Sequence, residues 1–333
     1  MKEIRIGKNQ CGQRLDKFLQ KYLSKAPKSF LYKMLRKKNI KRNGRRAEGS
    51  EILCEGDVLT LFLSDATLEK FSGGRSGAGT VSSQEAEEDL VCRRAAPTLD
   101  ILYENAHIAL INKPAGMLSQ KASAGDISLV EYFLEYTGGG EIGFRPGICN
   151  RLDRNTSGIV IGGKTLSGLQ YMSELLRERR IEKYYLAVVQ GVMQKEGIWQ
   201  AWLKKDRKNN KVEILEQETP GASYIKTGYE PLASDGINTL VRIRLYTGKT
   251  HQIRSHLANL GHPILGDPKY GGIVAGSHIK RQLLHAYELK FPLLKGDFAD
   301  LSEKVFRAEL PEDFYKENRV KQLIKKARKD EIL

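Results

Sequence analysis

Apolar residues recur at helical spacing near the N-terminus and are followed by turn and strand patterns. Residues 15–23 place Leu, Phe and Tyr on one face, which is typical of a helix with one buried side. Ser29 can cap a second short helix, and Asn43-Gly44 is a strong signal for a hairpin turn. The apolar run over residues 57–63 predicts a closing strand. Residues 1–65 are therefore predicted to form a small α/β module.

Strands and helices of mixed type follow from about residue 98. Short apolar runs predict strands over residues 108–111, 185–189 and 239–246. Thr165 can cap a helix over residues 166–180. Residues 98–310 are therefore predicted to form a second, larger domain.

Two segments lack this patterning. Residues 66–97 are rich in Gly and Ser and then acidic, which predicts a flexible linker. Residues 311–333 are charged and helix-prone, and we expect a tail that either packs on the surface or frays.

The charge of the chain indicates what kind of partner it binds. The 333 residues include 55 Lys and Arg against 40 Asp and Glu, a formal net charge of +15. Residues 1–65 hold 16 Lys and Arg against 7 Asp and Glu, so +9 of that charge lies in one fifth of the chain. This balance and a pI near 9.5 favour a nucleic-acid partner over a membrane surface.

The composition also excludes several classes of protein. No segment approaches the roughly 20 apolar residues of a membrane helix, and the start has no apolar signal-peptide core. The four cysteines, Cys11, Cys54, Cys92 and Cys149, are too far apart for a metal knuckle and give no disulfide framework. We therefore expect a cytoplasmic protein with reduced thiols.

One stretch of the small module is strongly basic. From residue 28 to residue 46 there are nine basic residues and no acidic one. They are Lys28, Lys33, Arg36, Lys37, Lys38, Lys41, Arg42, Arg45 and Arg46. A solvated helix usually alternates in sign, so we interpret this run as a phosphate-binding face.

The first candidate for chemistry is Asp153. It lies between Arg151 and Arg154, in a turn that Gly158 closes before an apolar run. We expect this carboxylate to stay ionised between the two arginines and to face a polyanion, as suits nucleophilic or base chemistry on a nucleic acid.

The second candidate is Arg254. Thr250 can cap a helix that Gly261 ends, and Arg254 then falls on the rim of its apolar face. A guanidinium against apolar surroundings needs a carboxylate, and we predict Asp153 as that partner. The alternative is an arginine whose head reaches out to water.

Other site types find little support. His251 and His256 are five residues apart, so they do not stack on one helical face, and the HExxH pattern is absent. Neither a phosphate loop nor a dinucleotide fingerprint is present. We expect no metal and no cofactor.

Residues 151–158 resemble the RLDxxTSG signature of the RluA family of RNA pseudouridine synthases. Further segments resemble that family in order, namely its NKPxG segment at residues 112–116, its KxYxAxVxG strand at 183–191, its TGRTHQIR block at 247–270 and its LLHA element at 284–286. The resemblance spans about residues 100–310, and residues 1–65 are similar to an S-four-type RNA-binding module.

The resemblance implies a role for each site residue. Asp153 matches the essential aspartate, which helps to break the C1′–N1 bond of uridine so that the uracil turns and reattaches through C5. Attack on the sugar, attack on the base and a glycal route all remain open. Tyr185 matches the tyrosine that stacks on the target base, Arg254 the arginine that pairs with the aspartate, and Arg151 a residue that fills the space of the flipped base.

The resemblance also implies a fold and a substrate. We expect an α+β catalytic domain with a mixed, mainly antiparallel sheet and flanking helices. The order of module and domain is similar to members that modify large-subunit ribosomal RNA, and we expect a monomer that acts on that RNA. The alternatives are a synthase for transfer RNA and a non-catalytic RNA-binding protein of ribosome assembly.

Overall fold

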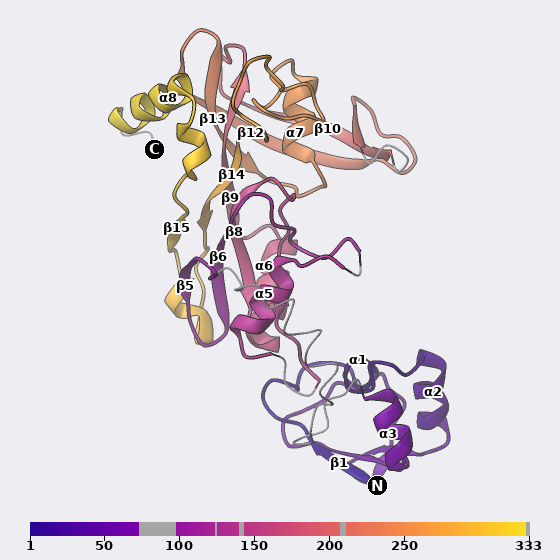
Figure 1. The fold of residues 1–333 in the computed structure, drawn as a ribbon. Coiled ribbons are helices and arrows are strands. Elements are labelled where there is room, and N and C mark those ends of the chain that lie inside the picture. The colour runs from indigo at the N-terminus through magenta and orange to yellow at the C-terminus, as the bar shows by residue number, and fades with distance from the viewer. Residues whose placement is uncertain (73–97, 124, 140–142, 207–210, 331–333) are drawn as a thin grey trace.

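The computed structural model describes residues 1–72, 98–123, 125–139, 143–206 and 211–330. In this part of the chain the strands form two sheets, a small one near the N-terminus and a large one in the remainder. Figure 1 shows the small sheet and its helices as a separate lobe beside the large sheet. None of the helices in the described part has the length and apolar character that crossing a membrane requires.

The N-terminal lobe is built on four antiparallel strands in the order β1-β4-β2-β3. Their bounds are Lys2–Arg5 for β1, Ile40–Arg42 for β2, Arg45–Arg46 for β3 and Val58–Leu61 for β4. Helices α1 (Leu15–Tyr22) and α2 (Lys28–Arg36) contribute Phe18, Leu19, Leu31 and Leu35 to its buried core. The predicted helices, the closing strand and the small α/β architecture are confirmed.

The hairpin turn and the start of the second helix are two local details of this lobe. Asn43 and Gly44 both have positive φ, 49° and 72°, which is the hairpin turn that the dipeptide predicted. The Ser29 cap was wrong, because α2 begins at Lys28 and Pro27 occupies the N-cap position. A proline suits a helix start, since its missing N–H has no partner there.

The predicted linker differs from the structure at its beginning. Asp65–Phe71 forms helix α3, whose first turn is capped by the Ser64 hydroxyl. Leu68 and Phe71 pack against the core of the lobe, and Phe30 lies 4.6 Å from Phe71 between ring centroids. These apolar contacts hold the segment on the lobe, while residues 73–97 of the predicted linker lie outside the described residues.

The large sheet contains eleven strands among the described residues, in the order β11-β10-β12-β13-β9-β14-β8-β6-β5, with β7 on β8 and β15 on β14. Their bounds are Ile101–Glu104 (β5), Ile108–Lys113 (β6), Gly147–Ile148 (β7), Ser157–Gly163 (β8), Glu182–Gln190 (β9), Gly197–Asp206 (β10), Lys211–Leu215 (β11), Ser223–Ser234 (β12), Asn238–Leu245 (β13), Leu284–Lys290 (β14) and Val305–Arg307 (β15). The pairing of β8 with β14 is parallel, and the other pairings are antiparallel. The predicted mixed, mainly antiparallel sheet is confirmed.

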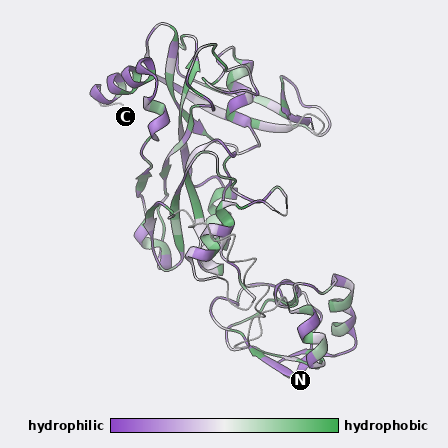
Figure 2. Cartoon of the chain, in the orientation of Figure 1, coloured by the Kyte–Doolittle hydropathy of each residue, from purple (hydrophilic) through white to green (hydrophobic). Residues whose placement is uncertain are grey.

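Helices cover both faces of this sheet. Residues that alternate along β6 and β8 go to opposite faces, so that Ala109, Ile111 and Val160 join one core and Ile108, Leu110 and Ile159 another. Helices α5 (Leu129–Tyr136) and α7 (Gln252–Asn259) pack on the first core, and α6 (Leu166–Arg177) with the short helix η1 (Gly296–Leu301) on the second. Figure 2 shows the hydrophobic stretches along these central strands.

Helix α6 begins as predicted and ends earlier. The Thr165 hydroxyl accepts a hydrogen bond from the Gly168 N–H at 3.1 Å, which confirms the cap. The helix ends at Arg177 and not at residue 180, because Arg179 has a left-handed backbone with φ 61°.

The C-terminal segment packs on the sheet. Helix α8 (Asn318–Lys329) buries Val320, Leu323, Ile324 and Ala327 against residues of β9, β12 and β13, together with the short helix η2 (Glu312–Tyr315). Of the two outcomes expected for this tail, packing is therefore the one that the structure has.

The parallel contact between β8 and β14 lies in the interior of the large sheet. It places Gly158 opposite Ala286, and Gly158 has a φ of 111°. A Cβ atom on Gly158 would lie 2.2 Å from the carbonyl oxygen of Ala286. Glycine is therefore required here by both backbone conformation and space.

The same contact contains a fully buried histidine. His285 Nε2 lies 3.0 Å from the carbonyl oxygen of Ala308, and its Nδ1 lies 2.9 Å from Ser157 Oγ. Because a carbonyl only accepts, Nε2 carries the hydrogen and Nδ1 accepts from the Ser157 hydroxyl. Burial is the main reason that the pKa of His285 is lowered to about 4.

We expect Gly158→Ala to lower the free energy of unfolding by at least about 2 kcal/mol, because it adds backbone strain and a steric overlap. Urea unfolding measures this value. Gly147→Ala is the matched control, since a Cβ there would meet no atom within 4 Å. Equal stability of the two variants would contradict the role given to Gly158.

We expect the protein to lose stability as the pH falls from 6.5 towards 4. A histidine in the unfolded chain binds its proton near pH 6.5, whereas folded His285 does so only near pH 4. Between these values the unfolded state binds more protons, so the free energy of unfolding falls as the pH falls. The contribution is at most about 3 kcal/mol below that window. His285→Gln should flatten the stability profile measured by urea unfolding, and the exposed His278 supplies the control His278→Gln. An unchanged slope in His285→Gln would refute this reading.

Candidate active site

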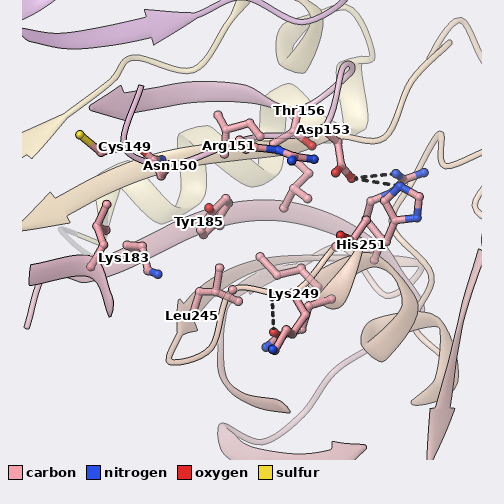
Figure 3. A pocket seen from close by; sticks show the side chains of 18 of the residues that line it. Cys149, Asn150, Arg151, Asp153, Thr156, Lys183, Tyr185, Leu245, Lys249 and His251 are labelled. Carbon is pink, nitrogen blue, oxygen red and sulfur yellow. Dashed lines mark hydrogen bonds and ion pairs between the residues drawn. The ribbon is translucent and has the colours of Figure 1, made fainter. Parts of the chain in front are cut away.

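A cavity of about 540 Å³ opens where the loop between β7 and β8 meets β9 and the start of α7. Asp153, Tyr185 and Arg254, the three residues predicted to carry chemistry, all line it. Arg151 and His251 line it as well, and Figure 3 shows Tyr185 on the strand that crosses its floor. The fold thus brings together segments that are about a hundred residues apart in the sequence.

The loop that carries Asp153 is fixed by its neighbours on both sides. The Thr156 N–H donates to the Asp153 carbonyl at 3.0 Å, which makes a tight turn. Leu152 is buried in the core, and its carbonyl accepts from Ser119 Oγ at 2.8 Å. The Arg281 guanidinium donates to the Asn155 carbonyl at 2.9 Å. The carboxylate therefore projects from a backbone that has little freedom.

Lys113 ties this loop to the end of β6. Its fully buried ammonium donates to the carbonyls of Pro114, Met117 and Arg154 at 2.8, 2.9 and 3.1 Å. Burial lowers the pKa of Lys113 to about 7, an effect that Arg281 reinforces and Asp153 opposes. The NKPxG segment thus has a structural task, because Lys113 holds the turn that begins at Asp153.

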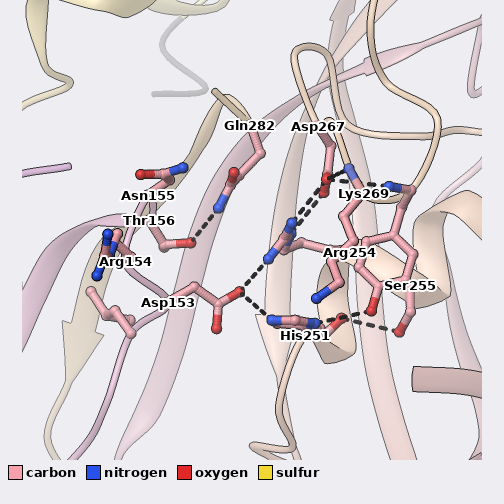
Figure 4. A network of polar contacts seen from close by, with 12 residues as sticks. Asp153, Arg154, Asn155, Thr156, His251, Arg254, Ser255, Asp267, Lys269 and Gln282 are labelled. Carbon is pink, nitrogen blue, oxygen red and sulfur yellow. Dashed lines mark hydrogen bonds and ion pairs between the residues drawn. The ribbon is translucent and has the colours of Figure 1, made fainter. Parts of the chain in front are cut away.

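Arg254 lies between two carboxylates. Its Nη1 donates to Asp153 Oδ2 at 2.8 Å, while Nε and Nη2 donate to the two oxygens of Asp267 at 2.7 and 2.9 Å (Figure 4). The Arg254 side chain is 7% exposed and Asp267 is 0% exposed. The hydrogen bonds and charges of both carboxylates raise the pKa of Arg254 despite its burial.

The structure places Arg254 against Asp153, as the helical wheel predicted, and excludes the arginine that reaches out to water. The predicted Thr250 cap was wrong. Helix α7 begins at Gln252, and its N-cap residue His251 has a left-handed backbone with φ 54° and makes no side-chain cap. Instead the Gln252 side chain accepts from the Lys249 N–H and the Thr247 hydroxyl, which fixes the loop ahead of the helix.

Tyr185 is buried at 7% exposure and presents its ring to the cavity. Burial and the nearby charge of Asp153 raise the pKa of the phenol, so that it stays neutral at physiological pH. Its neighbour Tyr184 lies on the other face of β9, where the guanidinium carbon of Arg242 sits 4.3 Å from its ring centroid. Tyr184 is therefore not part of the cavity lining.

The two arginines that flank Asp153 do not pair with its carboxylate. Arg151 and Arg154 are both exposed. Within the described residues the Asp153 carboxylate is paired with Arg254 at 2.8 Å and approached by His251 Nε2 at 3.8 Å. Arg151 still lines the cavity. The carboxylate is therefore held by Arg254, and the flanking arginines keep their charges available to solvent or to a ligand.

The basic residues of the N-terminal lobe lie on α2, on the β2–β3 hairpin and on the segment between them. Most of them are exposed, namely Lys28, Lys33, Arg36, Lys37, Lys38, Arg45 and Arg46. Lys41 and Arg42 are half-buried, and the Arg42 guanidinium is tied to Asp57 at 2.7 Å. Arg42 therefore has a structural partner that the sequence analysis did not foresee, whereas the seven exposed cations form an open basic surface.

Three residues of the site were missed. Asp267 lies in the matched block at residues 247–270, but Arg254 was given only one partner. His251 was weighed only as a metal ligand, and its Nε2 lies 3.8 Å from Asp153 Oδ2. Lys113 was visible as a single cation at the end of an apolar run. Among the described residues, no group of three or more His, Cys, Asp or Glu is arranged to hold a metal ion.

Comparison with known proteins gives consistent matches. The RNA pseudouridylate synthase family matches residues 107–259 of this chain. Ribosomal large subunit pseudouridine synthase C of Salmonella typhi is 32% identical over 316 residues, which cover 87% of this chain and 88% of the relative. The protein of the same description from Escherichia coli strain K12 is 31% identical over 316 residues, with the same coverage.

A solved structure has a similar fold. Human RNA Pseudouridylate Synthase Domain Containing 4 superposes with a TM-score of 0.54 at 24% identity, covering 67% of this chain and 92% of that chain. The large sheet and its flanking helices therefore have a counterpart of known structure.

We expect Asp267→Asn to lower the free energy of unfolding by about 3 kcal/mol, because it leaves the buried Arg254 guanidinium with one carboxylate in place of two. Urea unfolding tests this value. The matched control is Glu309→Gln, which breaks a surface pair between Arg328 and a carboxylate that is 85% exposed. That pair should be worth less than about 1 kcal/mol, and an equal loss in both variants would argue against the role of Asp267.

Proposed function

The chain belongs to the RNA pseudouridylate synthase family, and from this membership we propose that it converts uridines of large-subunit ribosomal RNA to pseudouridines. It is thus an isomerase that acts on RNA. In this reaction the C1′–N1 bond of uridine breaks, the uracil turns, and a C1′–C5 bond forms. No atom is lost and there is no net redox change.

We assign the central role to Asp153. Its carboxylate reaches into the cavity from a fixed loop, and Arg254 holds one of its oxygens at 2.8 Å. An ion pair of this kind orients the carboxylate, which nucleophilic and base chemistry both need. Arg254 is accordingly proposed as the residue that positions Asp153.

Tyr185 and Arg151 fit the handling of the target base. A uridine in structured RNA must leave its stack before the carboxylate can reach it, which costs a few kcal/mol. The neutral, buried ring of Tyr185 offers a flat surface in the cavity on which the base can stack. Arg151 is exposed at the rim, where its planar guanidinium can replace the lost stacking in the RNA.

The N-terminal lobe is proposed to supply RNA affinity. Its exposed cations can contact phosphates without reading sequence. The relatives at 31% and 32% identity are described as synthases of the ribosomal large subunit, and this supports ribosomal RNA as substrate in preference to transfer RNA. We propose that the protein works as a monomer in the cytoplasm.

One observation carries this proposal. A half-buried carboxylate, Asp153, shares a cavity with a buried tyrosine and is clamped by a buried arginine. A purely RNA-binding protein has no need for a charge pair that is costly to bury. The arrangement is what an aspartate-dependent reaction on a flipped base requires.

We expect the native protein to create discrete pseudouridines in large-subunit ribosomal RNA transcribed in vitro, and Asp153→Asn to create none. Chemical mapping of pseudouridine in the treated RNA measures both. The exposed Asp297 lies outside the cavity, so Asp297→Asn is the matched control and should modify the same sites as the native protein.

The outcomes separate the alternatives. Modification that persists in Asp153→Asn would refute the assignment of Asp153. Modification of transfer RNA alone, in a parallel reaction, would move the proposal to that substrate. Binding of ribosomal RNA without modification of either RNA would favour the non-catalytic protein.

A further inference from the structure

His251 stands next to the proposed catalytic carboxylate without a role so far. Its side chain is 12% exposed and lines the cavity directly before α7. Its Nε2 faces Asp153 Oδ2 at 3.8 Å, and Arg254 bonds to that same oxygen (Figure 4). Both cationic or donor groups that reach Asp153 thus meet one side of its carboxylate.

The other ring nitrogen of His251 is held from behind. Its Nδ1 lies 3.0 Å from the hydroxyl of Tyr270. That hydroxyl oxygen accepts a hydrogen bond from the Val212 backbone N–H at 3.2 Å. Tyr270 is fixed further by its ring, which lies 5.3 Å from the guanidinium carbon of Arg254.

These contacts define which nitrogen carries the hydrogen in neutral His251. The Tyr270 oxygen already accepts from Val212, so its own hydrogen is free to be donated to Nδ1. Nε2 then carries the ring hydrogen and points it at the Asp153 carboxylate. The opposite tautomer would leave the Tyr270 hydrogen without this acceptor and turn a lone pair towards an anion.

We propose that His251, fixed by Tyr270, is a positioning residue that donates from Nε2 to Asp153 Oδ2 when RNA is bound. Together with Arg254 it would occupy Oδ2 and leave Oδ1 as the oxygen that acts on the uridine. This inference rests on the proposed function of Asp153. A hydrogen bond spans about 2.7–3.2 Å, so from 3.8 Å the two groups must approach by at least about 0.6 Å, as active-site contacts often do in the complex.

The charges around His251 favour the neutral ring. Burial, Arg254 and Lys269 lower its pKa, while Asp153 and Asp267 raise it, and the net direction is downward. Tyr270 also faces the ring, and burial raises the pKa of its phenol. A neutral imidazole between a phenol and a carboxylate acts as a directed donor, not as a second cation.

The backbone of His251 supports a task for the side chain. Its φ of 54° lies in the left-handed region, which glycine and asparagine adopt more readily than histidine. A position under only conformational demands would favour asparagine or glycine. A histidine held in a sparsely populated backbone conformation at an active site is consistent with a functional task for its side chain.

Two amide substitutions separate the effect of the position of the donor nitrogen from the effect of the left-handed backbone. In His251→Gln the amide nitrogen lies four bonds from Cα, as Nε2 does, so it can still donate to Asp153. In His251→Asn the amide is one bond shorter and matches the position of Nδ1, while the residue tolerates the left-handed backbone better. Single-turnover rates of pseudouridine formation and RNA affinity would be measured for both variants.

We expect His251→Asn to react about tenfold to a hundredfold more slowly than His251→Gln, the effect of one lost hydrogen bond to a charged group. RNA affinity should be unchanged in both. If His251→Asn reacts as fast as His251→Gln or faster, the residue acts through its backbone or its packing and the proposal is overturned.

Tyr270→Phe tests the second link, because it removes the hydroxyl and keeps the ring beside Arg254. It should slow the native enzyme about threefold to tenfold and have little further effect in His251→Asn. An equal effect in both backgrounds would show that Tyr270 does not act through His251. Asp153→Asn separates failure of the proposed function from failure of this inference. Full activity in Asp153→Asn would refute the proposed function, whereas equal rates in the two His251 variants would refute this inference alone.

Discussion

The charge balance of one buried guanidinium governs the site. Arg254 sits at 7% exposure, where an unpaired charge would be severely destabilising, and two carboxylates neutralise it. Asp267 is fully buried and accepts hydrogen bonds from Arg254 through both oxygens, so it stabilises the buried guanidinium in the folded state without substrate. Arg254 can therefore turn its remaining nitrogen to Asp153, whose other oxygen is not needed for this balance. Stability and orientation are thus divided between two aspartates that hold the same arginine.

That division depends on how the sheet brings distant segments together. Asp153 precedes β8, and Arg254 lies on α7, far along the chain. Between them the parallel contact of β8 with β14 fixes the level at which the Asp153 loop leaves the sheet. Gly158 permits the two backbones to approach, and His285 and Lys113 hold the flanks of the loop by hydrogen bonds to Ser157 and to the carbonyl of Arg154. Fully buried polar groups that would be costly alone are satisfied here by fixed partners, so the loop has one conformation to offer.

Much of this could be predicted from local sequence. Periodicity located α1, α6 and the main strands, and the position of Arg254 on the rim of an apolar helix face led to its contact with Asp153. The predictions that were wrong concern contacts with partners that are distant in sequence. Nothing near Arg254 shows that Asp267 approaches it from beyond the helix, and the flanking Arg151 and Arg154 misled because neighbours in a turn point away from one another. Arg42 was assigned to phosphate because its bond to Asp57 exists only once β2 and β4 have paired.

The same balance explains why chemistry and affinity require different arginines. Arg254 is neutralised by two carboxylates, so it adds almost no attraction for a polyanion. Arg151, which lines the cavity, and Arg154 are both exposed, as are seven cations of the N-terminal lobe. In the proposed function these charges are available to the RNA backbone. Contacts of this second kind weaken with salt, because they displace counterions, whereas the buried pair is screened far less. Ionic strength should therefore act on how strongly RNA is held and leave the geometry of Asp153 unchanged, which separates the step of finding a substrate from the step of changing it.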